Sequence, residues 1–185
     1  MAGVLIKHAE ALETLAKVET LVVDKTGTLT MGKPRLVSLV AANSAASENE
    51  LLRLAASLER ASEHPLAAAI VAEAAERKLE LAGVDGFESL TGKGVVGQIG
   101  SKRVALGNQT LMETLSIKLE TSLSERAEKL RGEGQTVMLV AIDGQVAGLL
   151  GVADPIKAST PEAIRQLHAD GLRIVMLTGD SRKTA

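Results

Sequence analysis

The sequence predicts an α/β domain that is interrupted by an inserted α+β domain. A short apolar strand at residues 20–23 leads into a glycine-containing loop, and residues 152–185 return to a helix followed by a strand. The region between them is rich in glycine and lacks the alternation of strand and helix that a parallel sheet requires. We therefore expect residues 1–33 and 152–185 to form one domain and residues 34–151 to form the insertion. A single continuous α/β domain is the alternative.

The composition fits a water-soluble chain with a core. The 185 residues are 45% hydrophobic and carry a formal net charge of -2. One Phe, no Tyr and no Trp argue against a base-stacking surface, so we expect no nucleic-acid partner. The absence of cysteine excludes disulfides and thiolate metal sites. No apolar run approaches the roughly 18 to 20 residues of a membrane helix, so we expect no membrane insertion of this chain.

The first part of the chain places a carboxylate at the end of a strand. Helix-forming residues at 9–15 predict a lead-in helix, and Thr20-Leu21-Val22-Val23 predicts a strand that ends at Asp24. Ligands of open α/β sheets usually bind at the carboxyl ends of strands. The position of Asp24 therefore suits chemistry.

The inserted region begins with a strand and two helices. Residues 35–40 alternate like a strand, and Ser47 with Glu50 has the spacing of a capping box. Apolar residues at helical spacing predict a helix that ends near Ala61, namely Leu51, Leu54, Ala55 and Leu58. Pro65 suits the first turn of a second helix running towards Lys78.

The rest of the insertion is predicted to be mostly antiparallel. Glycines among β-branched residues at 87–107 indicate twisted strands, and Asp143-Gly144 indicates the turn of a hairpin formed by 136–142 and 145–152. Ser122 and Glu125 are interpreted as the start of a helix ending at about Arg131.

The final segment again has α/β character. Thr160 is interpreted as a helix cap, Pro161 as the first helical residue and Gly171 as the terminator. The strand 172–177 then leads into Thr178-Gly179-Asp180.

The residue types of the first loop suit phosphoryl transfer. An aspartate is a weak nucleophile, but a phosphoryl group needs mainly positioning and charge neutralisation. Lys25 offers positive charge, Gly27 permits close backbone approach, and Thr28 and Thr30 offer hydroxyls. From the residues alone, a structural turn at Asp24 remains an open alternative.

The run Asp24-Lys25-Thr26-Gly27-Thr28-Leu29-Thr30 resembles the phosphorylation signature DKTGTLT of P-type ATPases, which have an interrupted haloacid dehalogenase-like, Rossmann-type phosphorylation domain. The resemblance implies that Asp24 is the nucleophile and a magnesium ligand, and that Thr26 offers its backbone carbonyl to magnesium. It also implies that Thr178, Gly179 and Asp180 contact phosphate. Thr26 stands where related phosphatases often have a second Asp, which favours a lasting aspartyl-phosphate.

The inserted domain resembles the nucleotide-binding domain of the heavy-metal branch of that family. Ser62-Glu63-His64-Pro65-Leu66 resembles its SEHPL motif, which implies that His64 contacts ATP and that Glu59 accepts a hydrogen bond from the adenine amine. Taken alone, His64 would be interpreted as a structural histidine and Glu59 as a solvated charge.

Two further matches belong to the same resemblance. Gly92-Lys93-Gly94-Val95 is similar to the GxGV loop of the branch, and Gly107-Asn108 is similar to another nucleotide-contacting pair. Sheet turns are the structural alternative for these glycines. The KGAPE motif and the adenine-stacking Phe of other branches are not seen, and Phe87 is the only Phe.

The remaining matches concern the hinge and the cargo. Asp154-Pro155-Ile156-Lys157 resembles the DPxK segment near the return to the phosphorylation domain, and we expect a hinge there rather than a chemical role. The lead-in at residues 3–13 resembles the link to a membrane helix in copper, zinc and cadmium pumps, with copper favoured. An ordinary Asp-Pro turn is the alternative for 154–157.

The resemblance implies ATP and Mg2+ as cofactors, ATP or ADP as ligand, and the transmembrane and actuator domains of a full-length pump as partners. It implies a position on the cytoplasmic side of a membrane, and we expect a monomer. The later lysine and GDGxNDxP segment of the family lie beyond Ala185, so we expect ATP binding with weak or no phosphoryl transfer. A soluble phosphatase and a non-catalytic nucleotide-binding module are the alternatives.

Overall fold

The computed structural model describes residues 10, 13–14, 16–42, 47–64 and 66–178. Among these, the residues up to Gly32 and from Ile156 onward form unit 1, and Lys33–Pro155 form unit 2. The return to unit 1 falls after residue 152, because the last strand of unit 2 stays paired as far as Ala153.

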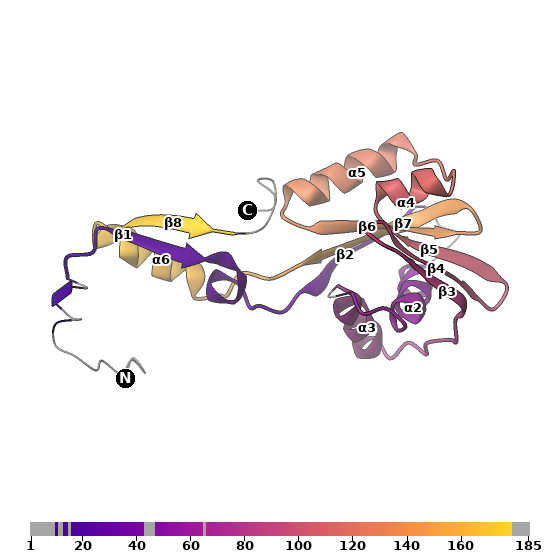
Figure 1. Ribbon diagram of the computed structural model, residues 1–185, viewed down its shortest axis with the longest axis horizontal. Helices are drawn as coiled ribbons and strands as arrows, with labels where there is room; N and C mark the ends of the chain where they lie inside the picture. The colour runs from indigo at the N-terminus through magenta and orange to yellow at the C-terminus, as the bar shows by residue number, and fades with distance from the viewer. Residues whose placement is uncertain (1–9, 11–12, 15, 43–46, 65, 179–185) are drawn as a thin grey trace. The chain divides into compact units, whose positions relative to one another are not determined.

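Unit 1 is built on two parallel strands and a helix (Figure 1). Strand β1 (Thr20–Asp24) pairs with β8 (Arg173–Leu177), and Asp24 lies opposite Leu177. The helix α6 (Thr160–Ala169) precedes β8, and Gly171 with φ +82° lets the chain turn from the helix into that strand. Asp24 is thus the last residue of its strand, as the sequence predicts.

Unit 2 contains a six-stranded antiparallel sheet in the order β2-β7-β6-β5-β4-β3. Its strands are β2 (Arg35–Ala41), β3 (Asp85–Leu90), β4 (Gly94–Ile99), β5 (Lys102–Gly107), β6 (Thr136–Ile142) and β7 (Gln145–Ala153). The predicted hairpin forms between β6 and β7. Its turn residues, Asp143 with φ +49° and Gly144 with φ +80°, have the backbone angles of a type I′ turn.

Helices cover both faces of this sheet (Figure 1). On one face lie α2 (Glu48–Glu59) and α3 (Ala67–Glu76), and on the other lie α4 (Gln109–Thr114) and α5 (Thr121–Gly132). Along β6, Met138 and Val140 pack in the cluster under α2 and α3, while Val137 and Leu139 pack in the cluster under α4 and α5. This alternation follows from the two-residue period of a strand, and the predicted fold class is confirmed.

The predicted capping box at the start of α2 is only half formed. Ser47 Oγ accepts a hydrogen bond from Glu50 N at 3.2 Å. The Glu50 carboxylate instead binds Arg53 Nε at 2.8 Å and Lys102 Nζ at 3.0 Å. The hydrogen bond from Arg53 and the neighbouring Lys102 hold the pKa of Glu50 at about 2. Glu50 therefore links α2 to the sheet.

Several predicted helix ends are wrong. Helix α5 starts at Thr121 with Glu120 as its cap, so Ser122 and Glu125 lie inside it. In α6 the N-cap position is Ser159, which makes no capping hydrogen bond through its side chain, and Thr160 is the first helical residue, with its hydroxyl donating to Leu29 O. The other two helix ends agree with the prediction, because α2 ends at Glu59, near Ala61, and α3 ends at Glu76, just before Lys78.

The structure describes only part of the lead-in helix that the sequence predicts. Of the lead-in helix at 9–15, Glu10, Glu13 and Thr14 are helical, and Thr14 Oγ1 donates to Glu10 O at 2.9 Å. Pro65, in unit 2, lies outside the described residues.

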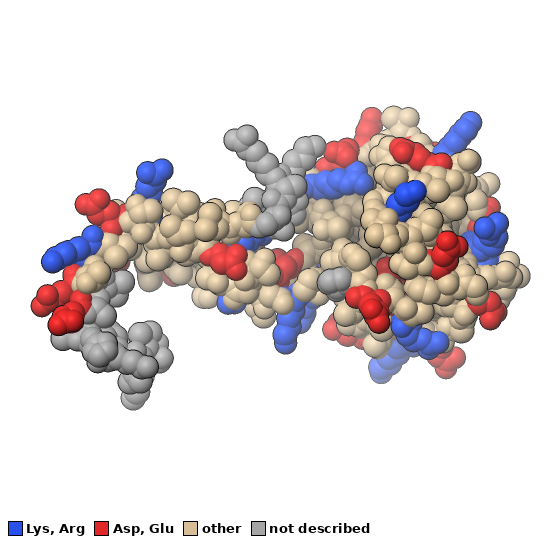
Figure 2. Space-filling model, in the orientation of Figure 1, with Lys and Arg blue, Asp and Glu red and all other residues tan. Residues whose placement is uncertain are grey.

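Among the residues that are described, no helix is long and apolar enough to span a membrane. On the face shown in Figure 2, acidic and basic side chains of unit 2 are interspersed, with no basic groove.

Candidate functional site

The loop that carries Asp24 begins where β1 ends. The Asp24 side chain is exposed, and Lys25 and Thr26 follow it at once. Because β8 runs parallel beside β1, Thr178 follows the end of the neighbouring strand. The structure thus brings Asp24 and Thr178 to one edge of the unit 1 sheet. Gly179 and Asp180, which the sequence assigns to the same site, lie outside the described residues.

The loop makes one tight turn, η1 (Lys25–Leu29). Thr26 has φ -74° and ψ 122°, and Gly27 has φ 76° and ψ -16°. These angles define a type II turn, whose third residue needs a positive φ. Gly27 is therefore required by the backbone conformation, and this requirement does not depend on any ligand.

The hydroxyl of Thr30 fixes the central peptide of this turn. Thr30 is buried, with 1% of its surface exposed. Its Oγ1 accepts a hydrogen bond from Gly27 N at 3.1 Å and donates to Lys25 O at 3.2 Å. The N–H and C=O of a trans peptide point in opposite directions. The Gly27 N–H points to Thr30, so the Thr26 carbonyl, the predicted magnesium ligand, is directed away from Thr30.

A second segment of unit 1 holds the same loop. Lys157 Nζ donates to Gly27 O at 2.6 Å, and Lys157 N donates to Leu29 O at 3.0 Å. Thr160 Oγ1 also donates to Leu29 O, at 2.7 Å. Sequence reasoning missed both side chains, although Lys157 belongs to the predicted hinge motif. Asp154 has a structural contact within unit 2, where its Oδ1 accepts from Lys33 N at 3.1 Å.

In unit 2, Glu59 is a buried carboxylate at the end of α2. It is 4% exposed, and its Oε2 has no hydrogen-bond partner among the described residues. Burial raises the pKa of Glu59, while the nearby Ser62 and the electrostatic effect of His64 oppose that rise. An acceptor left unsatisfied in this way costs stability unless a donor arrives. Glu59 is therefore not the solvated charge that its residue type alone suggests.

His64 lies just before α3 with its side chain exposed. Its Nδ1 accepts a hydrogen bond from Leu66 N at 3.2 Å, and its own N–H donates to Ser62 Oγ at 3.2 Å. A neutral imidazole that accepts at Nδ1 carries its proton on Nε2. This hydrogen bond thus assigns Nε2 as a donor directed to solvent or ligand.

Glu59 and His64 line the same depression, between the end of α2 and the start of α3. Its volume is about 360 Å³. Charged, hydroxyl and apolar side chains share its wall, and the lining residues are Glu59, Arg60, Ser62, Glu63, His64, Ala67, Ala68 and Val71. A buried acceptor and an exposed donor beside an apolar helix surface are groups that can recognise a nucleobase by hydrogen bonds and packing.

The predicted glycines form a second group in unit 2, and strand packing accounts for two of them. Gly94 and Gly107 lie opposite each other in β4 and β5. A Cβ on Gly94 would lie 2.2 Å from Leu106 O, and one on Gly107 would lie 2.2 Å from Lys93 O. Gly92 has open space around it, but its φ of +71° favours glycine. Neither of the two depressions described here is lined by these glycines.

Asn108 ties this group together. Its Oδ1 accepts from Leu111 N at 3.1 Å, which caps α4, and its Nδ2 donates to Gly92 O at 2.8 Å. Neither this cap nor the helix was predicted from the sequence. An Asn directly before Gln109-Thr110-Leu111-Met112 is a cap signal that could have revealed them. Asn108 therefore has a structural role, whatever else it contacts.

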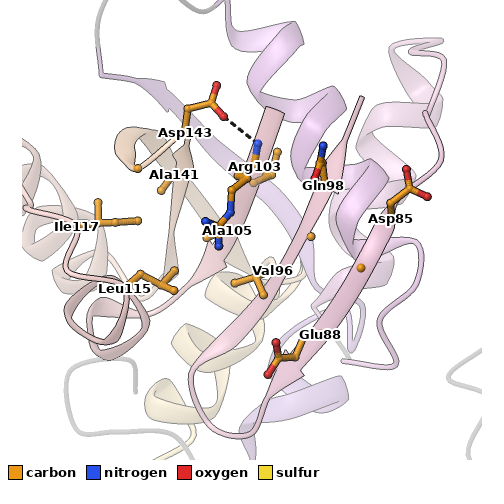
Figure 3. A pocket seen from close by; sticks show the side chains of 14 residues that line it. Asp85, Glu88, Val96, Gln98, Arg103, Ala105, Leu115, Ile117, Ala141 and Asp143 are labelled. Atoms are coloured by element: carbon orange, nitrogen blue, oxygen red, sulfur yellow. Dashed lines mark hydrogen bonds between the residues drawn. The ribbon is translucent and has the colours of Figure 1, made fainter. Parts of the chain in front are cut away.

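A larger depression of about 590 Å³ lies on the other face of the sheet (Figure 3). Ala105 and Ala141 belong to its lining and to the core under α4 and α5, whereas Glu59 lies at the end of α2. Charged and polar side chains also line this depression, namely Asp85, Glu88, Gln98, Arg103 and Asp143. None of the predicted site residues lines it, so the two depressions are separate.

Known proteins are similar to the chain over nearly all of its length. A copper-transporting P-type ATPase of Rhizobium leguminosarum bv. viciae is 56% identical over 99% of this chain and 22% of its own length. A silver exporting P-type ATPase of Salmonella typhimurium is 48% identical over the whole chain and 22% of its own length. The chain thus spans about a fifth of these relatives.

The fold of the chain is also similar to that of a solved structure. The crystal structure of a zinc-transporting PIB-type ATPase in the E2.Pi state matches with a TM-score of 0.85 and 37% identity, covering 97% of this chain and 29% of that one. The family model of the haloacid dehalogenase-like hydrolases matches residues 18–185, which include β1, the Asp24 loop and the second segment of unit 1. The chain therefore belongs to the haloacid dehalogenase-like hydrolase family, and it is similar along its whole length to metal-transporting P-type ATPases.

Proposed function

We propose that this chain is the ATP-binding and phosphorylation portion of a metal-exporting P-type ATPase, in which Asp24 accepts the γ-phosphoryl group of ATP. Unit 2 would be the nucleotide-binding domain and unit 1 the phosphorylation domain. The relatives support this proposal through their names, and the position of Asp24 at the end of β1 supports it independently.

One observation carries the nucleotide site, which is the buried Glu59 Oε2 without a partner. A carboxylate oxygen accepts hydrogen bonds and donates none, at least while it is ionised. Adenine presents an exocyclic amine that can satisfy it, whereas guanine presents a carbonyl oxygen at the corresponding position. Glu59 therefore favours adenine, and the lining of the depression gives the base an apolar surface in Ala67, Ala68 and Val71.

His64 would supply the second polar contact. With Nδ1 occupied by Leu66 N, its Nε2–H can donate to a ring nitrogen or to a phosphate oxygen of the nucleotide. The side chain is exposed, so this donor is available without rearrangement of the core. Gly92, Gly94, Gly107 and Asn108 are proposed to lie near the phosphates, where the absence of side chains on the glycines permits close approach.

The chemical step would take place at Asp24. One carboxylate oxygen attacks the γ-phosphorus, the bond between that phosphorus and the β,γ-bridging oxygen breaks, and ADP leaves with the electron pair. The product is an aspartyl-phosphate, whose hydrolysis by water restores the carboxylate. Lys25 supplies positive charge beside the acceptor, and Thr178 would approach the phosphate from the end of β8.

The oxygen donors of this loop fit a magnesium ion. Magnesium in phosphoryl-transfer sites is bound by one or two carboxylates, by substrate phosphates and by water. Asp24 offers a carboxylate, and the directed Thr26 carbonyl offers a backbone oxygen. Among the described residues, no cluster of three acidic, His or Cys side chains could serve instead. When bound, magnesium would neutralise charge on the transferring phosphate.

Phosphoryl transfer by this chain alone is expected to be weak or absent. Parallel strands are usually covered on both faces, yet Val22, Met176 and Leu177 on β1 and β8 are 54%, 37% and 59% exposed. We therefore infer that further strands of a longer protein would cover the exposed apolar residues of unit 1. Such a protein would hold the unit on the cytoplasmic side of a membrane, together with transmembrane and actuator domains, and this chain would be monomeric.

Copper is the proposed cargo. The relatives named above transport copper or silver, and the similar structure transports zinc. The chain has no Cys, and none of its described residues form a metal cluster, so the cargo would bind elsewhere in the protein. Stimulation of ATP hydrolysis in the whole pump by Cu(I), compared with Ag(I) and Zn(II), would identify the cargo.

Nucleotide titration followed by NMR tests the site. We expect ATP and ADP to shift the amide signals of Glu59, His64 and Gly94, and His64→Ala to weaken binding while the spectrum stays folded. His168→Ala is the matched control, because His168 lies in α6 of unit 1. Global unfolding of the His64 variant would support a structural histidine instead. Steady release of phosphate from a small phosphomonoester would favour the soluble phosphatase.

A further inference from the structure

Two side chains from the second segment of unit 1 hold the loop η1 from outside it. Lys157 Nζ donates to Gly27 O at 2.6 Å, and Thr160 Oγ1 donates to Leu29 O at 2.7 Å. The backbone of the same segment adds a hydrogen bond from Lys157 N to Leu29 O at 3.0 Å. Thr160 is buried and Lys157 is partly buried. The loop is thus tied to side chains that lie about 130 residues later in the chain.

The Lys157 ammonium completes the hold on Gly27. Thr30 Oγ1 accepts from Gly27 N at 3.1 Å, and Lys157 Nζ donates to Gly27 O. The two peptides on either side of Gly27 therefore each have an anchor. A glycine can adopt both signs of φ, whereas the turn needs the φ of 76° that Gly27 has here. Two anchors select one conformation at the residue of the loop that has the greatest freedom.

The motif of residues 154–157 has two separable parts. Asp154 Oδ1 accepts from Lys33 N at 3.1 Å, within unit 2, and this contact suits the predicted hinge. Lys157 instead reaches a loop of unit 1 with its charged end. A charged donor makes a shorter and stronger hydrogen bond than a neutral one, and 2.6 Å is short for such a contact. A hinge by itself does not require this donor.

We propose that Lys157 is a positioning residue for phosphoryl transfer to Asp24, because its ammonium holds the Gly27 carbonyl and thereby the turn that presents the Thr26 carbonyl to magnesium. This inference rests on the proposed function. Lys157 does not touch the reacting atoms, and it acts through Gly27. It adds a role at the acceptor loop to a segment for which the sequence predicts only a hinge.

The first test uses this chain without nucleotide or magnesium. Lys157→Met keeps the length of the side chain and removes the donor. We expect about ten-fold faster hydrogen exchange at Gly27 N, which corresponds to the loss of one hydrogen bond from a charged group. Exchange in β1 and β8 should stay unchanged, which would show that unit 1 is folded. Lys157→Arg keeps a charged donor and should restore most of the protection.

Lys33→Met is the matched control. Lys33 is exposed, and its hydrogen bond to Asp154 comes from its backbone N–H, which the substitution retains. Exchange at Gly27 N should therefore be the same as in the unsubstituted chain. Lys157→Gln serves as a second removal of the charge should the Met variant not fold.

The second test measures formation of the aspartyl-phosphate from ATP in the whole pump. Lys157→Met should slow this step about ten-fold or more, while the Kd for ATP stays unchanged because the proposed nucleotide site lies in unit 2. The magnesium concentration for half-maximal phosphorylation should rise, since the loop would present the Thr26 carbonyl only part of the time. Loss of a positive charge alone would instead strengthen magnesium binding. Lys157→Arg should restore both values.

Each result decides between the roles. Unchanged exchange at Gly27 N and an unchanged rate of phosphorylation in Lys157→Met would overturn the positioning role. A lower magnesium requirement would contradict it and indicate an electrostatic role, and so would a slower rate with full protection at Gly27 N. Phosphorylation that persists in Asp24→Asn would overturn the proposed function itself, whatever the Lys157 variants do.

Discussion

Units 1 and 2 hold their candidate residues in different ways. In unit 2, a six-stranded sheet is covered on both faces, and two clusters of buried side chains hold α2 and α4 in place. Glu59 is the last residue of α2, and Asn108 lies directly before α4. In unit 1, two strands and one helix leave Val22 and Leu177 exposed. The Asp24 loop is held there mainly by hydrogen bonds from Thr30 and Lys157. The candidate residues of unit 2 thus stand on a packed core, whereas the Asp24 loop is held by hydrogen bonds.

The largest expected effect tests the two cores against each other. Leu54 is fully buried in α2, whereas Val22 is 54% exposed on β1. Leu54→Ala should lower the free energy of unfolding of unit 2 by about 2 to 5 kcal/mol through lost burial and a cavity. Val22→Ala should change that of unit 1 by less than about 0.5 kcal/mol. Residue-resolved hydrogen exchange in denaturant would measure both, and equal effects would remove the contrast.

A pair of glycine substitutions sharpens the description of unit 2. Gly107→Ala should destabilise by up to about 3 kcal/mol, because the new Cβ would overlap the Lys93 carbonyl and the strands cannot separate cheaply. Gly92→Ala meets no neighbouring atom and should cost only about 1 to 2 kcal/mol for its left-handed φ. Thermal unfolding of both variants would compare them. A larger loss for Gly92→Ala would contradict the packing explanation of Gly107.

A single substitution can remove the Thr30 hydroxyl, which supports the Asp24 loop of unit 1. Thr30→Val keeps the shape but loses the hydroxyl that joins Gly27 N to Lys25 O. Gly27 N then loses this partner, whereas Lys25 O keeps the hydrogen bond from Thr30 N, and we expect the loop to lose about 1 to 2 kcal/mol of stability. Faster hydrogen exchange at Gly27, with no change in β6, would be the sign. Protection at Gly27 that equals that of the unsubstituted chain would show that Lys157 and Thr160 suffice.

The smallest expected effect depends on pH, and the same substitution should change stability and nucleotide binding in opposite directions. Burial raises the pKa of Glu59 in the folded chain above its ordinary value of 4.5. The folded state therefore favours the protonated form, and stability is lost as pH rises from about 4.5 through the raised pKa. Glu59→Gln should thus be more stable than the unsubstituted chain at pH 7, and this gain should vanish below about pH 4.

The same variant should bind ATP less well, because a neutral amide is a weaker acceptor than a carboxylate. Unfolding by urea at pH 4 and pH 7, together with ATP titration at pH 7, gives both quantities. Lower stability of Glu59→Gln at neutral pH would contradict a Glu59 Oε2 that is left without a partner in the folded chain.

The sequence predicted most elements because local signals agreed with the fold. Asp143-Gly144 predicted the hairpin since both residues tolerate a positive φ, and Asp24 was placed correctly because a β-branched run precedes it. Two of the misses have one cause in common. Thr160 and Glu50 have the residue types of helix caps, yet more distant groups engage them, Leu29 O in one case and Lys102 in the other. Sequence spacing does not show such competition.

The sequence by itself determined the fold class, the family and the identity of the candidate groups, because those depend on residue types and their order along the chain. Only the tertiary structure decided how the groups are held. It buried Glu59 and left one oxygen unsatisfied, gave Gly107 a packing reason, and brought Lys157 to the carbonyl of Gly27, 130 residues earlier. Burial, interstrand distance and the direction of a hydrogen bond arise when distant segments meet, and no local pattern contains them.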